Sequence, residues 1–261
     1  LSHRDMPVSS IVYGPVPSWR LGRSLGIDLL STERKTCSFD CIYCQLGPTV
    51  HPLTERREFV SLGRLAAELE GVQGVEADYV TFSGVGEPTL AANLGPAISL
   101  SKSLLNKPVA VLTNSSLMPR EDVRRDLAAA DVVVAKVDAP DEETFHTVNR
   151  PVPGYCLDEV LRGIELFRRS HEGRLALQMM FVEANKHTAA TLAQIARRLS
   201  PDEVQLNTPL RPCGTRPLAP REMAAIKREF VGLKVVEVYQ ADTVEVRALD
   251  AVETLRRRPQ G

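Results

Sequence analysis

Short apolar segments alternate with segments of helical periodicity along most of this chain. Residues 25–30 and 78–82 have strand composition, and a cysteine-rich loop or a glycine-rich turn follows each of them. Residues 62–69 and 94–105 instead repeat apolar side chains every three to four positions, which predicts helices. The same alternation predicts strands over 108–113, 132–137, 175–181 and 203–206, and helices over 120–129, 157–169 and 188–199.

Strands that alternate with helices form βαβ units, which build a parallel sheet. The expected strands are apolar on both faces, as in the valine run at 132–134, and this suits a sheet covered by helices. We therefore predict an α/β fold, a partial (β/α)6 barrel with parallel strands, over residues 23–210. A lead segment over 1–22 precedes the barrel. A C-terminal extension over 211–261 follows it, with a helix over 221–230 and β-like runs over 234–239 and 243–248.

The charge pattern gives no case for a nucleic-acid partner. The chain has 32 lysines and arginines against 33 aspartates and glutamates, a formal net charge of -1, with no long block of one sign. A tRNA partner stays possible, but net charge does not support it. Because no run of 18 apolar residues and no signal-peptide pattern occurs, we expect no membrane partner and a cytoplasmic protein.

Three of the five cysteines crowd into eight positions, directly after the first expected strand. Cys37, Cys41 and Cys44 form a CxxxCxxC arrangement, which is too tight for an ordinary set of disulfides in a chain of this length. Thiolates are the usual ligands of iron–sulfur clusters, and three of them leave one iron of a cubane open for chemistry. Two alternatives each normally need a fourth ligand: a non-catalytic iron–sulfur electron carrier, and a zinc-stabilised RNA-binding module whose site is completed by His51 or another residue. A third alternative is three incidental buried cysteines.

This arrangement, with an aromatic residue just before the last cysteine, resembles the signature of the radical S-adenosylmethionine (radical SAM) superfamily. The resemblance implies a 4Fe-4S cluster on Cys37, Cys41 and Cys44, with S-adenosyl-L-methionine (SAM) chelating the open iron. It implies reductive cleavage of SAM to a 5′-deoxyadenosyl radical, which abstracts hydrogen from a substrate. Tyr43 holds the aromatic position, which in the superfamily lies beside the adenine. An electron donor such as flavodoxin or ferredoxin is then a partner.

Two turns after later strands fit the same resemblance. The turn after residue 82 is similar to the superfamily's glycine–glutamate turn, where backbone groups meet the methionyl amine, and a plain strand-to-helix loop is the alternative. Glycine suits that role because a residue without Cβ lets a ligand approach the main chain. The turn after residue 112 is similar to the superfamily's threonine–asparagine turn. The candidate SAM-binding residues in these turns are Ser83, Gly84, Gly86, Glu87, Thr113, Asn114 and Ser115.

Polar residues at the ends of the last three strands complete the candidate cofactor site. Lys136 can pair with the methionyl carboxylate and Asp138 can accept from ribose hydroxyls, while an ordinary solvated strand end is the alternative. Gln178 and Asn207 are polar positions in apolar strands, so they point at ligand or form a core hydrogen-bond network. All of these positions lie at the carboxyl ends of strands, where α/β barrels place their sites.

Within the superfamily, residues 13–28, the segment after Cys44 and the sequence at 149–151 resemble small proteins grouped with the wyosine-type tRNA-modifying enzymes. Those synthases carry a second cluster on three further cysteines, whereas only Cys156 and Cys213 remain here. The resemblance therefore implies the type of reaction but does not identify the substrate. We expect an unidentified nucleoside or other small-molecule substrate.

Cys213 and several arginines fall in loops. Cys213 follows the last barrel strand and is a candidate catalytic residue, because a cysteine there can donate a hydrogen atom, contact a metal or hold substrate; packing as a small apolar side chain is the alternative. Loop arginines can bind an anionic substrate bidentately or can be solvated. The arginines in question are Arg20, Arg23, Arg150, Arg211 and Arg216.

Overall fold

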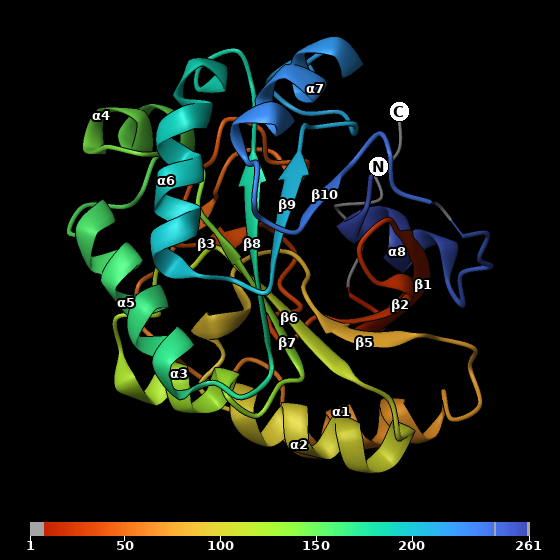
Figure 1. The fold of residues 1–261 in the computed structure, drawn as a ribbon. Coiled ribbons are helices and arrows are strands. Elements are labelled where there is room, and N and C mark those ends of the chain that lie inside the picture. The colour runs from red at the N-terminus through yellow and green to blue at the C-terminus, as the bar shows by residue number, and fades with distance from the viewer. Residues whose placement is uncertain (1–7, 243, 260–261) are drawn as a thin grey trace.

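The computed structural model describes residues 8–242 and 244–259 and is built on a curled, mostly parallel sheet (Figure 1). The sheet order is β1-β2-β5-β6-β7-β8-β9-β10, and every neighbouring pair is parallel except β1 with β2. The predicted partial barrel is confirmed. Its strands are β1 (Val12–Ser18), β2 (Gly22–Ile27), β5 (Tyr79–Phe82), β6 (Val109–Thr113), β7 (Val132–Lys136), β8 (Arg174–Met180), β9 (Glu203–Asn207) and β10 (Val235–Glu237).

Helices cover the outer face of this sheet (Figure 1). All of them except α4 and α8 begin close to predicted positions, since the apolar periodicity that indicated them is the face that packs on the strands. They are α1 (Leu62–Glu70), α2 (Leu94–Leu105), α3 (Glu121–Leu127), α4 (Glu142–Thr144), α5 (Leu157–Ser170), α6 (Ala189–Leu199), α7 (Pro220–Glu229) and α8 (Ala251–Arg257). Shorter elements are β3 (Thr36–Cys37), β4 (His51–Pro52), the 3-10 turns Pro88–Leu90 and Lys186–Thr188, and a π turn at Phe145–Asn149.

The two faces of each strand pack into different layers. In β7, Val133 and Ala135 join the large core shared with the helices, whereas Val132 and Val134 join a small apolar cluster with Leu21. Because side chains alternate along a strand, that second cluster lies on the inner face of the barrel. Apolar side chains therefore fill one part of the interior, and polar side chains occupy the strand ends beyond it.

The first barrel strand ends earlier than the sequence suggested. It was expected over 25–30, but β2 stops at Ile27. The Asp28 carboxylate explains the difference, since its Oδ1 accepts hydrogen bonds from the backbone N–H of Leu30 (3.2 Å) and of Ser31 (3.0 Å). This side-chain turn ends the strand and starts the cysteine loop.

Both edges of the sheet lie outside the six predicted strands. At one edge β1, from the expected lead segment, pairs antiparallel with β2. At the other edge β10 pairs parallel with β9 and matches the β-like run at 234–239. The second run, 243–248, contains no strand over its described residues 244–248, and Thr243 lies outside the described residues. Helix α8 was not predicted.

Helix α8 is tied to the barrel by a buried ion-pair network. The Arg257 side chain is fully buried; its Nε donates to Asp28 Oδ2 at 2.9 Å, and its Nη1 pairs with Glu253. Its Nη2 also donates to the carbonyl of Ser10 at 2.7 Å, just before β1. The C-terminal helix is thus fixed to both the first edge strand and the turn that opens the cysteine loop.

Candidate active site

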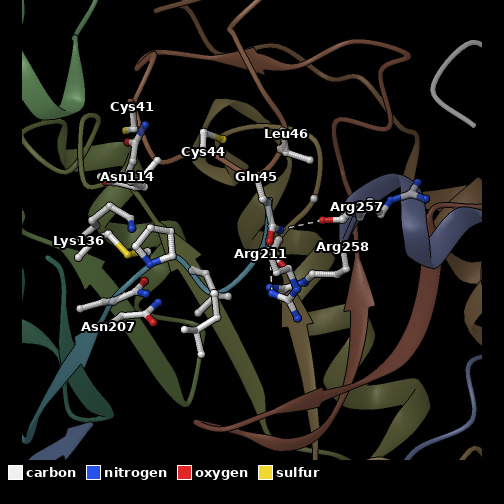
Figure 2. Close-up of a pocket in the computed structure, with 18 of the residues that line it drawn as sticks. Cys41, Cys44, Gln45, Leu46, Asn114, Lys136, Asn207, Arg211, Arg257 and Arg258 are labelled. Atoms are coloured by element: carbon white, nitrogen blue, oxygen red, sulfur yellow. Dashed lines mark hydrogen bonds between the residues drawn. The ribbon is translucent and has the colours of Figure 1, made fainter. Parts of the chain in front are cut away.

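One pocket of about 640 Å³ lies where the cysteine loop meets the carboxyl ends of the barrel strands. Figure 2 shows Cys41, Cys44, Asn114, Lys136 and Asn207 around it. Thirteen of the sixteen candidate site residues line this pocket although they are far apart in sequence. They are Cys37, Cys41, Tyr43, Cys44, Ser83, Gly84, Gly86, Glu87, Thr113, Asn114, Lys136, Gln178 and Asn207.

The cysteine loop is held in place by backbone hydrogen bonds to distant segments. Asp40 N donates to Arg150 O and Ile42 N to Val148 O, each at 3.0 Å. These bonds anchor the middle of the loop to the π turn after β7. The loop therefore has a fixed shape that presents all three cysteines to the pocket.

Two glycines of the turn after β5 are required by the packing of the protein itself. A Cβ on Gly86 would overlap the carbonyl oxygen of Thr36 in the cysteine loop, and a Cβ on Gly84 would overlap the Asp28 carboxylate. The sequence argument assigned glycine here to the close approach of a ligand. The structure adds a second reason, because this turn packs directly against the backbone that carries Cys37.

Amide groups and an ammonium group surround the thiols. Asn114 Nδ2 lies 3.5 Å from Cys37 Sγ, and Asn149 Nδ2 lies 3.6 Å from Cys41 Sγ. The buried Lys35 side chain lies in the same loop. Burial lowers the pKa of Lys35, but the negative charges of the cysteines and of Asp40 outweigh that effect and raise it.

Burial disfavours the thiolate form of two of the cysteines. It raises the pKa of Cys37 to about 12 and, together with the Asp138 charge, raises the pKa of Cys41 to about 11. A bound cation reverses this balance, because metal coordination deprotonates a thiol. The charged form of either thiol, in the buried Cys37 or the half-buried Cys41, therefore needs a positive partner.

These residues fit an iron–sulfur cluster. All five cysteines are free, and three of them line one pocket with N–H donors directed at sulfur, an arrangement that tunes such clusters. Among the described residues, no three His, Cys, Asp or Glu side chains gather closely enough to hold a single metal ion. A cubane makes no such demand, because each of its thiolates binds a different iron.

Glu87 joins the two predicted turns. Its carboxylate accepts hydrogen bonds from Thr89 N and Thr89 Oγ1 in its own turn, and from Thr113 Oγ1 (2.7 Å) and Asn114 N (2.6 Å) in the next. Burial raises the pKa of this carboxyl group, although the same hydrogen bonds oppose the rise. The two bonds from Thr113 and Asn114 fix the ends of β5 and β6 relative to each other.

Tyr43 is fixed by polar residues behind it. Its hydroxyl donates to Asp138 Oδ2, and Asn149 Nδ2 bonds both Tyr43 OH (3.1 Å) and Asp138 Oδ2 (2.8 Å). The Lys136 ammonium lies 4.9 Å from the centre of the Tyr43 ring. The ring and the lysine therefore face the pocket as a pair, and Asp138 supports them.

Three candidate residues lie behind the pocket wall. Asp138 is buried, and its Oδ1 accepts from Met180 N at 2.8 Å. Ser115 is buried and donates to the carbonyl of Lys136 at 3.1 Å. Cys213 is half-buried, lies 3.2 Å from the carbonyl of Thr215 and packs with the apolar group around Tyr43. These three are not among the residues that line the pocket in the described chain.

The loop arginines separate into two groups. Arg20 and Arg211 line the pocket, whereas Arg23 pairs with Asp78, and Arg150 and Arg216 are exposed. Sequence reasoning missed other pocket or loop residues: Lys35, Gln45, Asn149 and Arg258. Lys35 and Gln45 flank the cysteine motif, so proximity to it was the available signal; Arg258 gave none.

The sequence profile of the radical SAM superfamily matches residues 35–195, which is more than half of the chain. This chain belongs to the radical SAM superfamily. Two relatives match the chain over longer stretches of sequence. A UPF0026 protein of Methanocaldococcus jannaschii is 38% identical over 226 residues, 84% of this chain and 70% of the relative. A UPF0026 protein of Synechocystis is 41% identical over 202 residues, 77% of this chain and 76% of the relative.

Solved radical SAM structures share the fold. Streptococcus suis SuiB bound to S-adenosylmethionine superimposes with a TM-score of 0.60 at 13% identity, over 78% of this chain and 48% of SuiB. A radical SAM methyltransferase from Sphaerobacter thermophilus gives a TM-score of 0.60 at 16% identity, over 82% of this chain and 65% of that protein. The family match, and not these distant structures, identifies the chain as a radical SAM enzyme. In its described part, no helix is long and apolar enough to cross a membrane.

Proposed function

We propose that this radical SAM protein cleaves SAM reductively at a 4Fe-4S cluster bound by Cys37, Cys41 and Cys44. The observation that carries the proposal is the single pocket into which the three free thiols and the carboxyl ends of β5 to β9 face. When bound, the cluster supplies the electron that breaks a carbon–sulfur bond of SAM and yields a 5′-deoxyadenosyl radical. The substrate from which hydrogen is then taken is a nucleoside or another small molecule.

Different residues of the pocket are available to bind different parts of SAM. The Lys136 ammonium lines the pocket 4.9 Å from the centre of the Tyr43 ring and is available to pair with the methionyl carboxylate. The Tyr43 ring offers a flat surface for the adenine. Gln178 and Asn207, on neighbouring strands, offer amide groups to the ribose or the adenine edge.

Asp138 and Glu87 act through other residues in this proposal. Asp138 accepts from Tyr43 and Asn149 and so orients the ring. Glu87 binds Thr113 and Asn114 and so positions the amide that reaches the Cys37 sulfur. Cys213 packs against the apolar cluster that contains Tyr43 and Met180, and it keeps its candidate role with the substrate. An external donor such as flavodoxin or ferredoxin supplies the electron.

The experiment that tests this proposal is anaerobic reconstitution with iron and sulfide. The wild-type chain should gain an iron–sulfur absorption band and convert SAM to 5′-deoxyadenosine and methionine under dithionite. Replacing Cys37, Cys41 or Cys44 with alanine should abolish both the band and the products. Cys156→Ala is the matched control, because Cys156 does not line the pocket, and it should keep both. Iron retention near the wild-type value in all three variants would refute the ligand assignment.

A further inference from the structure

Four arginines line the pocket, and three of them remain after Arg257, which pairs with Asp28 and Glu253, is set aside. Arg20 lies in the turn between β1 and β2, Arg211 in the loop after β9, and Arg258 directly after α8. Figure 2 shows Arg211 and Arg258 together, across the pocket from Asn114, Lys136 and Asn207. The arginine end of the pocket is therefore separate from the residues proposed to hold SAM.

Among the described residues, no carboxylate forms an ion pair with Arg20, Arg211 or Arg258. Arg20 Nε and Nη1 are buried and have no hydrogen-bond partner in the described chain, although the guanidinium lies 4.9 Å from the centre of the Trp19 ring. Arg211 Nη1 donates to an uncharged acceptor, Gln45 Oε1, at 3.2 Å. The carboxylate that lines the pocket, Glu87, is already bound by Thr89, Thr113 and Asn114.

The arginines destabilise one another's charge. Burial and the charges of Arg258 and Arg211 lower the pKa of Arg20 to about 9. Burial and the Arg258 charge lower the pKa of Arg211 to about 10. Arg257 differs, because Asp28 and Glu253 neutralise it. Buried like charges without counter-ions are costly, and a bound anion removes that cost.

We propose that Arg20, Arg211 and Arg258 bind a phosphate group carried by a small-molecule substrate of this enzyme. The identification of the ligand as substrate rests on the proposed function, whereas the phosphate site itself does not. A phosphate dianion compensates two of the three guanidinium charges and offers several acceptor oxygens to their planar donors. A single carboxylate compensates only one of the three.

The neighbours of the arginines suit the rest of such a molecule. Trp19 and Leu210 adjoin Arg20 and Arg211 in sequence and line the same pocket, so an apolar or planar group next to the phosphate has a surface to contact. Gln45, which follows Cys44, donates to the carbonyl of Arg257 at 3.0 Å and accepts from Arg211. A ligand anchored at the arginines thus lies in the cavity that the cysteines also line.

The test is calorimetric titration of inorganic phosphate into the anaerobically reconstituted protein. Phosphate should bind saturably, and Arg20→Gln and Arg211→Gln should each weaken binding at least about tenfold. Arg216→Gln, an exposed arginine of the same loop as Arg211, should leave binding unchanged. SAM affinity should stay unchanged in all three variants. Thermal melts monitored by circular dichroism identify any variant that fails to fold. If Arg20→Gln or Arg211→Gln fails to fold, phosphate binding by the other of these two variants decides the test.

Several results would overturn the inference. These are no saturable phosphate binding, equal loss in Arg216→Gln, or acetate binding as tightly as phosphate. A matching loss of SAM affinity would assign the arginines to the SAM carboxylate instead. Binding of an RNA oligonucleotide that phosphate does not displace would replace the small molecule by a nucleic acid. If phosphate binds as expected but SAM is not cleaved, the proposed function fails and the phosphate site stands.

Discussion

At the scale of single residues, the site combines buried thiols with groups that favour their charged form. Cys37 and Cys41 lie against amide donors from Asn114 and Asn149, and the Lys35 ammonium lies in the same loop. Burial works in the opposite direction and keeps the metal-free thiols protonated. Whether Cys37 and Cys41 are charged therefore depends on whether a positively charged group, such as a metal cluster, is bound to them.

The raised thiol pKa values give a pH prediction for the apoprotein. The folded state favours the neutral thiols, so their contribution to the free energy of unfolding is fully present below the ordinary cysteine pKa. That contribution is lost as the pH rises toward about 11 for Cys41 and about 12 for Cys37. At pH 8, iodoacetamide should alkylate both at least about tenfold more slowly in folded than in urea-unfolded protein. Mass spectrometry of labelled peptides measures the ratio, and equal rates would contradict the burial argument.

At the scale of elements, the cysteine loop and α8 are both fixed by contacts that join distant parts of the chain. Gly86 packs on the backbone of Thr36, and Arg257 reaches Asp28 across the full length of the sequence. Asp28 is common to both arrangements, because its carboxylate also accepts from Val85 N at 3.2 Å. The turn after β5 and the C-terminal helix are thus connected through one buried side chain.

Gly86→Ala tests the packing of the turn on the cysteine loop. The added Cβ must displace the Thr36 carbonyl, so we expect a stability loss of about 1–3 kcal/mol and reduced iron incorporation. The matched control is Gly63→Ala in α1, where a Cβ meets nothing within 4 Å. There alanine should be neutral or stabilising by up to about 1 kcal/mol. Urea unfolding and iron assays decide, and wild-type iron content in Gly86→Ala would contradict the packing claim.

Arg257→Met tests the buried network under α8. Removing the guanidinium leaves the Asp28 and Glu253 carboxylates buried without their partner, which should cost about 3–5 kcal/mol in urea unfolding. Arg169→Met breaks an exposed pair with Glu165 and should cost less than about 1 kcal/mol. Similar costs in the two variants would show that the α8 network does not stabilise the fold.

At the scale of the whole molecule, local sequence patterns predicted the strands and helices of the barrel. Contacts between distant segments position the elements that were not predicted, β1 and α8. The six inner strands and their helices were predictable because each buries a periodic apolar face. Strand β1 was not, since Gly14, Pro15 and Pro17 interrupt its pattern and its partner β2 supplies the stabilising pairing. Helix α8 holds its place through Arg257, which local sequence does not reveal as buried.

The candidate site was likewise predictable where local sequence motifs define it and not where it depends on contacts between distant segments. The cysteine spacing and the strand ends placed most of the candidate residues in one pocket, because in parallel barrels these ends meet at one rim. The positions of Asp138, Ser115 and Cys213 behind the wall depend on side-chain direction, which composition does not reveal. The arginine site joins three segments that no single motif links. The wyosine-type grouping, the division at residues 22 and 210, and the individual SAM contacts stay predictions.

The central claim is that SAM binds the open iron of a cluster held in this pocket. Electron paramagnetic resonance of the reduced, reconstituted protein tests it most directly, because a ligand on that iron alters the cluster signal. We predict a changed spectrum on adding SAM, with Lys136→Gln needing at least about tenfold more SAM for the same change. A cluster signal that saturating SAM leaves unaltered in the wild-type protein would contradict the account.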